Sequence, residues 1–254
     1  MKIAASDFDG TLFHREAGIS QEDLAAIKRW QAAGNKFGLV TGRNLHLARL
    51  NLDDFDLKLD FFVGLNGAVI FDEHQQEVFS DDMSPEAVKG LWQHEIARVS
   101  PYVMTLRGKD TFAKWNDKSC WFPPLHDNIP EITKEEAQSL PHVLQMCFSA
   151  PTAERAAELA ADIRQRFAGQ LSAEANLHYV DVCAAGNSKA TGLTHLQECL
   201  GWQEFPLYVI GDDLNDLSMI EKFQGFAMAS GNPLAQAAAQ AVFPSVGAML
   251  EAKL

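Results

Sequence analysis

The sequence Asp7-Phe8-Asp9-Gly10-Thr11-Leu12 decides how the rest of this chain is interpreted. It follows a short apolar run, residues 2–6, which has the pattern of a buried strand that delivers polar side chains at its carboxyl end. Asp7 and Asp9 are two residues apart on an extended segment, so both carboxylates can face one site. Gly10 allows the chain to turn sharply behind them. The stretch therefore predicts an acidic pair at the end of a first strand.

The same pattern returns late in the chain, where the apolar run 207–210 precedes Gly211-Asp212-Asp213-Leu214-Asn215-Asp216. A further strand, predicted at 37–40, ends at Thr41. In a doubly wound parallel sheet, ligands bind beyond the carboxyl ends of the strands, so one pocket can hold all three segments. Clustered carboxylates repel one another unless a cation lies among them, and oxygen ligands favour a hard divalent ion. Mg²⁺ is the predicted cofactor.

The order of the predicted elements indicates an α/β fold. Strands at 2–6, 37–40 and 61–65 alternate with helices, one capped by Ser20 and closed by Gly34, which is the βαβαβ rhythm of a doubly wound, Rossmann-like parallel sheet. From Ser84 the pattern changes to a helix through Val99, alternating strands at 143–148 and 178–183, and a helix between them at 152–169. After Ala185 the first rhythm returns, and Asn232 and Pro233 are placed as the cap and first residue of a last, Ala-rich helix. The expected division is a core of residues 1–83 and 186–254 and an inserted α+β cap domain at 84–185.

Composition narrows the class of partner. The 254 residues carry 21 Lys and Arg against 34 Asp and Glu, a net charge of −13, which disfavours nucleic acid and anionic membranes as partners. The four cysteines, at 120, 147, 183 and 199, form no Cys-x-x-Cys pair, so neither a disulfide scaffold nor a zinc site is expected. No targeting segment is visible, and the uncharged stretch 226–250 contains polar residues and prolines typical of buried core. We expect a cytoplasmic protein, more readily a monomer than a dimer, that acts on a small molecule.

These motifs resemble those of a known family. The two acidic segments, together with Thr41-Gly42-Arg43, Asn66-Gly67-Ala68 and Ser188-Lys189, resemble in order the motifs of the haloacid dehalogenase-like phosphatases, in particular the Cof-type sugar-phosphatase branch. The resemblance spans the whole chain. It departs from the family pattern at Ala190, where glycine is common, and at Pro233, where alanine is usual. Neither departure removes a reacting group.

The resemblance implies a Mg²⁺-dependent hydrolysis of phosphate esters. Asp7 is the expected nucleophile, which forms an aspartyl-phosphate, and Asp9 is the expected general acid and base, with a protonated resting form. Lys189 and Thr41 are expected to stabilise the phosphoryl oxygens. The implied metal ligands are Asp7, the backbone carbonyl of Asp9, and Asp212; the implied substrate contacts are Gly42, Arg43, Asn66 and Asn215; and the residues implied to orient the metal waters and the lysine are Asp213 and Asp216.

Other interpretations of the same residues stay open. A phosphomutase would pass the aspartyl-phosphate to a sugar instead of water. A signalling receiver would keep a phosphorylated Asp as a switch, and a non-catalytic protein would only bind a sugar phosphate. Asn66-Gly67 is also an ordinary turn pair. In the cap, the charged loop 107–110 is expected to be solvated, and Trp115, Trp121 and Phe122 are expected to be buried sheet aromatics rather than a stacking surface.

Overall fold

The computed structural model describes residues 1–117 and 129–254 and divides into two compact units. Met1–Phe79 and Ser188–Leu254 form one, here called the core unit, and Ser80–Asn187 form the other, here called the inserted unit. The sequence predicts that the inserted unit begins at 84 and ends at 185. In the structure it begins at Ser80 and ends at Asn187. Cys120, Trp121 and Phe122 lie outside the described residues.

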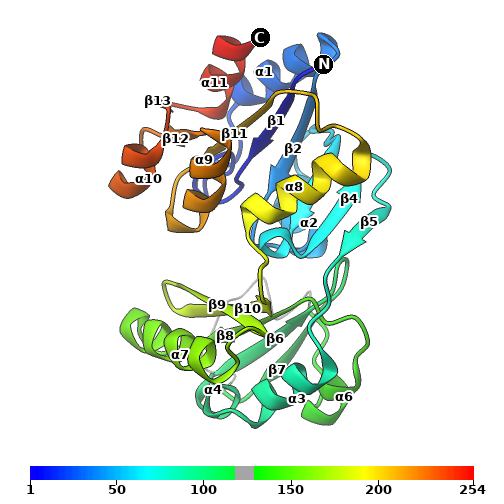
Figure 1. The fold of residues 1–254 in the computed structure, drawn as a ribbon, viewed down its shortest axis with the longest axis vertical. Coiled ribbons are helices and arrows are strands. Elements are labelled where there is room, and N and C mark those ends of the chain that lie inside the picture. Colours follow the sequence, from blue (N-terminus) through cyan, green and yellow to red (C-terminus); the bar gives the residue numbers. More distant parts are fainter. Residues whose placement is uncertain (118–128) are drawn as a thin grey trace. The chain divides into compact units, whose positions relative to one another are not determined.

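The core unit is built on an eight-stranded sheet with the order β13-β12-β11-β1-β2-β3-β4-β5 (Figure 1). Its strands are β1 (Ile3–Ser6), β2 (Lys36–Val40), β3 (Phe61–Gly64), β4 (Val69–Asp72), β5 (Glu77–Ser80), β11 (Leu207–Gly211), β12 (Phe226–Met228) and β13 (Ala241–Phe243). The neighbouring pairs from β13 to β3 run parallel, and β4 lies antiparallel to β3. The predicted α/β fold with a parallel sheet is therefore confirmed, whereas the sequence interpretation missed β4 and β5.

Helices cover both faces of this sheet. Successive side chains of each strand point to opposite faces, so neighbouring residues contact different helices. Val209 belongs to the apolar cluster that includes Leu193 of α8, whereas the neighbouring Tyr208 meets Trp30 of α1 edge to face at 6.2 Å. The helical segments are α1 (Gln21–Ala32), α2 (Leu45–Leu52), η1 (Leu65–Gly67), α8 (Lys189–Leu200), η2 (Leu214–Asp216), α9 (Leu217–Phe223), α10 (Pro233–Ala238) and α11 (Val246–Lys253). Within the described ranges, no helix has the length and apolar character needed to cross a membrane.

Two helix starts follow the predicted capping. The Ser20 side chain accepts the Asp23 backbone N–H before α1, and the Asn232 side chain accepts the N–H of Leu234 before α10, with Pro233 in the first turn. The prediction that this is the last helix is wrong. α10 ends at Ala238, and β13 and α11 follow it.

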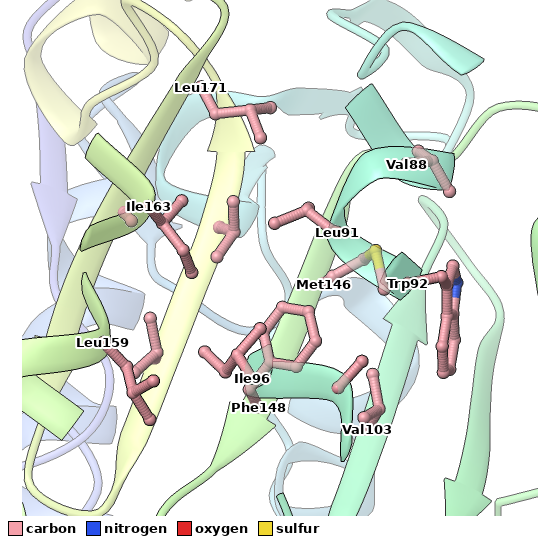
Figure 2. Packing of buried hydrophobic residues seen from close by; sticks show 14 of the residues in the cluster. Val88, Leu91, Trp92, Ile96, Val103, Met146, Phe148, Leu159, Ile163 and Leu171 are labelled. Atoms are coloured by element: carbon pink, nitrogen blue, oxygen red, sulfur yellow. The ribbon is translucent and has the colours of Figure 1, made fainter. Parts of the chain in front are cut away.

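The inserted unit is a five-stranded antiparallel sheet with helices packed on one face. The strand order is β7-β6-β8-β10-β9. Its elements are α3 (Pro85–Gln93), α4 (Glu95–Val99), β6 (Tyr102–Leu106), β7 (Thr111–Trp115), α6 (Lys134–Ser139), β8 (Gln145–Ser149), α7 (Ala153–Arg166), β9 (Leu171–Asn176) and β10 (Tyr179–Ala184). Figure 2 shows side chains from the helices and the sheet meeting in one apolar core, among them Leu91, Ile163, Met146 and Phe148.

The single helix predicted through Val99 is broken at His94, which separates α3 from α4. His94 has extended backbone angles, φ −68° and ψ 154°. Its Nδ1 accepts the backbone N–H of Ile96, and its Nε2 lies 2.9 Å from a carboxylate oxygen of Asp162. The side chain therefore caps α4, and the apolar spacing across it could not reveal the break because both helices bury the same face.

A close backbone contact fixes the start of α8 in the core unit. Leu65, Asn66 and Gly67 all have positive φ, of 52°, 54° and 99°. A Cβ added to Gly67 would lie 2.3 Å from the carbonyl oxygen of Ser188, and one added to Gly192 would lie 2.5 Å from the Cα of Gly67. The turn and the helix touch through backbone atoms, so both positions require glycine.

An acidic residue is half-buried in the sheet of the inserted unit. Asp181 on β10 lies opposite Cys147 on β8 and opposite Glu174 on β9. Burial raises the pKa of Asp181 to about 6, with a hydrogen bond to Cys147 opposing the shift and the charge of Glu174 adding to it. The ionised form of Asp181 therefore costs stability in the folded chain.

We expect Gly192→Ala to destabilise the chain by about 1–3 kcal/mol, because its Cβ would overlap the Gly67 backbone. Helix propensity alone predicts the opposite sign, a gain of about 1 kcal/mol. Urea unfolding followed by circular dichroism measures the change. Cys199→Ala, at an exposed position of the same helix, is the matched control and should be nearly neutral. A more stable Gly192→Ala variant would show that the contact does not hold α8 in place.

We expect the free energy of unfolding to fall by about 2 kcal/mol as the pH rises from about 4 to about 6, because the unfolded chain ionises Asp181 first. Above the folded pKa of about 6 this contribution becomes constant. Asp181→Asn should remove that part of the slope and stabilise the chain near neutral pH. Urea unfolding over this pH range tests the prediction, with Glu77→Gln as an exposed control. Parallel pH profiles for Asp181→Asn and the parent chain would contradict it.

Candidate active site

Three strand ends of the core sheet carry the polar segments that the sequence singled out. Asp7 follows β1 directly, Thr41 follows β2, and Asp212 follows β11. β1 lies between β11 and β2, and all three strands run parallel. Their carboxyl ends therefore share one edge of the sheet, and the side chains that follow them lie close together.

A buried lysine lies among the carboxylates. Lys189, the first residue of α8, donates from Nζ to Oδ1 of Asp7 at 2.6 Å and to Oδ1 of Asp216 at 2.5 Å. The side chains of Lys189 and Asp216 are fully buried, and that of Asp7 is 7% exposed. This geometry orients one oxygen of Asp7 toward the lysine and leaves the other beside Thr11.

The acidic loop after β11 is shaped around Asp216. Oδ2 of Asp216 accepts the backbone N–H groups of Asp212 and Asp213, at 2.8 and 3.0 Å. A Cβ on Gly211 would lie 2.3 Å from the Asp216 carboxyl carbon, so only glycine fits at that position. Asp216 thus holds both the loop backbone and the Lys189 side chain in place. Asp213, in contrast, is exposed, and its carboxylate accepts a hydrogen bond from Asn232.

The charges of this cluster change one another's proton affinity. Burial raises the pKa of Asp7 well above its usual range; Lys189 opposes the shift, and Asp216 and Asp212 add to it. Burial likewise raises the pKa of Asp212, against a hydrogen bond from Thr11. Burial lowers the pKa of Lys189, but the carboxylates of Asp216 and Asp7 outweigh this and raise it above its usual value. Lys189 therefore stays charged, whereas Asp7 and Asp212 bind a proton more tightly than an isolated aspartate does.

The donor set fits a divalent cation. Asp7, Asp212 and Asp216 each offer a carboxylate oxygen, and the three atoms lie within 4.8 Å of one another. Asp216 already uses both oxygens on Lys189 and the loop backbone, so Asp7 and Asp212 are the better placed ligands. Hard oxygen donors without nitrogen or sulfur suit Mg²⁺. The Asp9 carboxylate is not a member of this cluster.

The Asp9 side chain is instead paired with Arg43. Nε and Nη2 of Arg43 donate to the two carboxylate oxygens of Asp9, at 2.7 and 2.5 Å. Both Asp9 oxygens thus accept hydrogen bonds from one guanidinium, and the protonated resting form expected from the sequence stays a prediction. Arg43, expected to contact substrate, makes its side-chain hydrogen bonds with Asp9 and α2.

The remaining candidates lie near the same edge. Thr41 is buried, and its Oγ1 accepts the backbone N–H of Arg43. The Asn66 backbone N–H donates to the carbonyl of Thr41, and a Cβ on Gly42 would lie 3.3 Å from the Asn66 amide. Oδ1 of Asn66 is buried and accepts no hydrogen bond from the described residues. Asn215 is exposed in η2.

Sequence reasoning gave no role to Thr11 or Asn51. Thr11 Oγ1 donates to Oδ1 of Asp212 at 2.8 Å, and its place inside the first acidic motif was a usable signal. Asn51 accepts a hydrogen bond from Arg43 at 2.6 Å. Nothing in the sequence marks Asn51, because it is an ordinary polar residue on a helix, eight positions after its partner.

Comparisons with known proteins agree with this architecture. The family model for haloacid dehalogenase-like hydrolases matches residues 4–247. The 5-amino-6-(5-phospho-D-ribitylamino)uracil phosphatase YwtE of Bacillus subtilis is 26% identical over 249 residues, covering 87% of this chain and 85% of its own. The pyridoxal phosphate phosphatase YbhA of Escherichia coli is 27% identical over 257 residues, covering 91% and 88%.

A solved structure shows the same fold over the full length. The HAD/COF-like hydrolase from Plasmodium vivax superposes with a TM-score of 0.85 at 20% identity, covering 100% of this chain and 95% of its own. Together with the family match over residues 4–247, this confirms the resemblance found in the motifs. The chain belongs to the haloacid dehalogenase-like hydrolases.

Proposed function

We propose that this chain is a Mg²⁺-dependent phosphatase that hydrolyses small phosphorylated metabolites, sugar phosphates foremost, through an aspartyl-phosphate on Asp7. The observation that carries the proposal is the Asp7 carboxylate itself. It lies at the end of β1, almost fully buried, with Lys189 on one oxygen and Asp212 nearby. A nucleophile, a fixed cation and a set of oxygen donors for a metal thus meet at one strand edge.

The roles of the side chains follow from their contacts. Asp7 attacks phosphorus, and Lys189, held at 2.6 Å from it, neutralises negative charge on the phosphoryl oxygens. Thr41 and the backbone of Gly42 donate hydrogen bonds to the same oxygens. Asp9 donates a proton to the leaving oxygen and then takes one from the attacking water.

The acidic cluster supplies the metal site. Mg²⁺, held by Asp7, Asp212 and the backbone carbonyl of Asp9, would offset the repulsion between the Asp7 carboxylate and an anionic phosphate. Asp216 keeps the loop and Lys189 in place for this site, and Asp213 is proposed to orient the metal waters. Asn66 and Asn215 are proposed to contact the phosphorylated substrate.

The substrate class is supported by the relatives. YwtE and YbhA are named for phosphorylated small molecules, one with a ribityl chain and one with a pyridine ring. The net charge of −13 disfavours nucleic acid as substrate. We propose a cytoplasmic monomer whose inserted unit selects the leaving group.

Asp7→Asn should reduce phosphate release by about 10³-fold or more, because the amide is a poor nucleophile. The assay is phosphate release from phosphorylated sugars, nucleotides, cofactors and p-nitrophenyl phosphate, with and without Mg²⁺. Asp56→Asn, at an exposed carboxylate paired with Lys28, is the matched control.

Assays with the same set of substrates also distinguish a phosphatase from the alternative functions. Unchanged turnover by Asp7→Asn would exclude Asp7 as the nucleophile. If the parent chain is folded and binds Mg²⁺ but releases no phosphate from any of these substrates, a mutase or a binding protein would be favoured. A long-lived phospho-Asp without phosphate release would favour a receiver.

Lys189→Met should destabilise the chain by about 3–5 kcal/mol, because it leaves the Asp7 and Asp216 carboxylates buried without their cation. Added Mg²⁺ should raise the melting temperature of this variant more than that of the parent chain, since the cation replaces the missing charge. Thermal unfolding with and without Mg²⁺ measures both effects. Lys222→Met, which removes an exposed lysine, is the control. A loss below about 1 kcal/mol would contradict the structural role of Lys189.

A further inference from the structure

Arg43 links helix α2 to the carboxylate of Asp9. On one side, its Nε and Nη2 donate to the two oxygens of Asp9. On the other side, Nη1 donates to the side-chain oxygen of Asn51 at 2.6 Å and to the backbone carbonyl of Leu47 at 3.1 Å. The planar fork of arginine suits this bridge, since a lysine could not engage both carboxylate oxygens and the helix at once.

Further contacts hold Arg43 in place. Its guanidinium carbon lies 5.1 Å from the centre of the Phe8 ring, which is fully buried. Its backbone N–H donates to Thr41 Oγ1 at 3.2 Å, and its carbonyl accepts the N–H of Leu65 at 3.1 Å. The side chain is 27% exposed, so most of it is packed. Arg43 therefore has one well-defined position from which to act on Asp9.

Asp9 depends on this contact more than Asp7 depends on any single partner. The Asp9 side chain is 51% exposed, whereas that of Asp7 is 7% exposed. Among residues 1–117 and 129–254, Arg43 is the source of the hydrogen bonds to the Asp9 carboxylate. An exposed aspartate on a loop samples several rotamers unless something fixes it. The pair with Arg43 supplies that constraint.

We propose that Arg43, anchored by Asn51, is a positioning residue that orients the Asp9 carboxylate toward the water that hydrolyses the aspartyl-phosphate, so that Asp9 can take its proton. This inference rests on the proposed phosphatase function. It differs from the substrate contact that the family resemblance implies for Arg43. Two donors of one planar guanidinium hold the two Asp9 oxygens, which fixes the plane and direction of the carboxylate.

The two half-reactions place different demands on Asp9. In the first, a bond forms between an Asp7 oxygen and phosphorus, the ester P–O bond breaks, and the leaving oxygen takes a proton from Asp9. In the second, a bond forms between the water oxygen and phosphorus, the bond to Asp7 breaks, and a water proton passes to Asp9. A p-nitrophenolate leaving group needs no proton, so with this ester only the second half-reaction requires Asp9.

The test is rapid-quench kinetics of Arg43→Leu with p-nitrophenyl phosphate and Mg²⁺. We expect a burst of p-nitrophenol approaching one equivalent per enzyme, followed by a steady state about 10- to 100-fold slower than that of the parent chain. Acid quenching should trap phosphate on Asp7. The burst itself shows that the variant has a folded, reactive site.

Three further variants sharpen the result. Asn51→Leu removes the anchor without touching Asp9 and should give the same burst with a smaller loss of kcat. Arg43→Lys keeps the charge but not the fork and should restore kcat only in part. Arg49→Leu is the matched control, because Arg49 lies on the same helix, 47% exposed and 3.8 Å from Asp53, and its removal should leave the kinetics unchanged.

Other outcomes overturn the inference. A raised KM with unchanged kcat would mean that Arg43 binds substrate. A lower kcat without accumulated phosphoenzyme would mean that Arg43 serves the first half-reaction, and unchanged kinetics would mean that the pair has no role. If the parent chain forms no phosphoenzyme on Asp7, the proposed function fails, which is distinct from each of these.

Discussion

The core unit depends on a buried cation among buried acids. Lys189 lies between Asp7 and Asp216, with its side chain fully buried and its Nζ at 2.6 and 2.5 Å from their oxygens. Without it, the ends of β1 and β11 could not bring their carboxylates together, because unpaired buried charge is strongly destabilising. The hydrogen bonds of Asp216 to the loop backbone then extend this constraint to Asp212. One ion-pair network thus sets both the loop conformation and the position of the Asp7 carboxylate.

The backbone is arranged to deliver that lysine. α8 begins at Lys189, and its Gly192 packs directly on Gly67 in the left-handed turn after β3. The helix axis is therefore fixed by contact between main chains, which has less freedom to relax than contact between side chains. The same turn carries Asn66, whose backbone binds the carbonyl of Thr41. The ends of β2 and β3 and the start of α8 are consequently one rigid assembly.

Features with a local cause could be predicted from the sequence. Apolar runs that end in acidic residues predicted the carboxyl ends of β1 and β11. The capping residues Ser20 and Asn232 predicted the starts of two helices. The family resemblance supplied the roles of the site residues, which residue types alone leave open. β4 and β5 were missed, since one short antiparallel hairpin at the sheet edge interrupts the rhythm of alternating strands and helices. The contact between Arg43 and Asp9 was beyond reach because it depends on side-chain rotamers and on a helix residue, Asn51, that carries no motif.

The return of the chain from the inserted unit ends immediately before Lys189. Ser188 accepts the backbone N–H of Thr191 at 3.1 Å, and Thr191 Oγ1 accepts the N–H of Ser188 at 2.8 Å. This reciprocal cap closes the first turn of α8 on itself, one residue after the boundary at Asn187. The hydrogen bonds that close the start of α8 therefore lie entirely within the core unit. Sequence changes in the inserted unit therefore need not alter the hydrogen bonds that hold Lys189 at the start of α8.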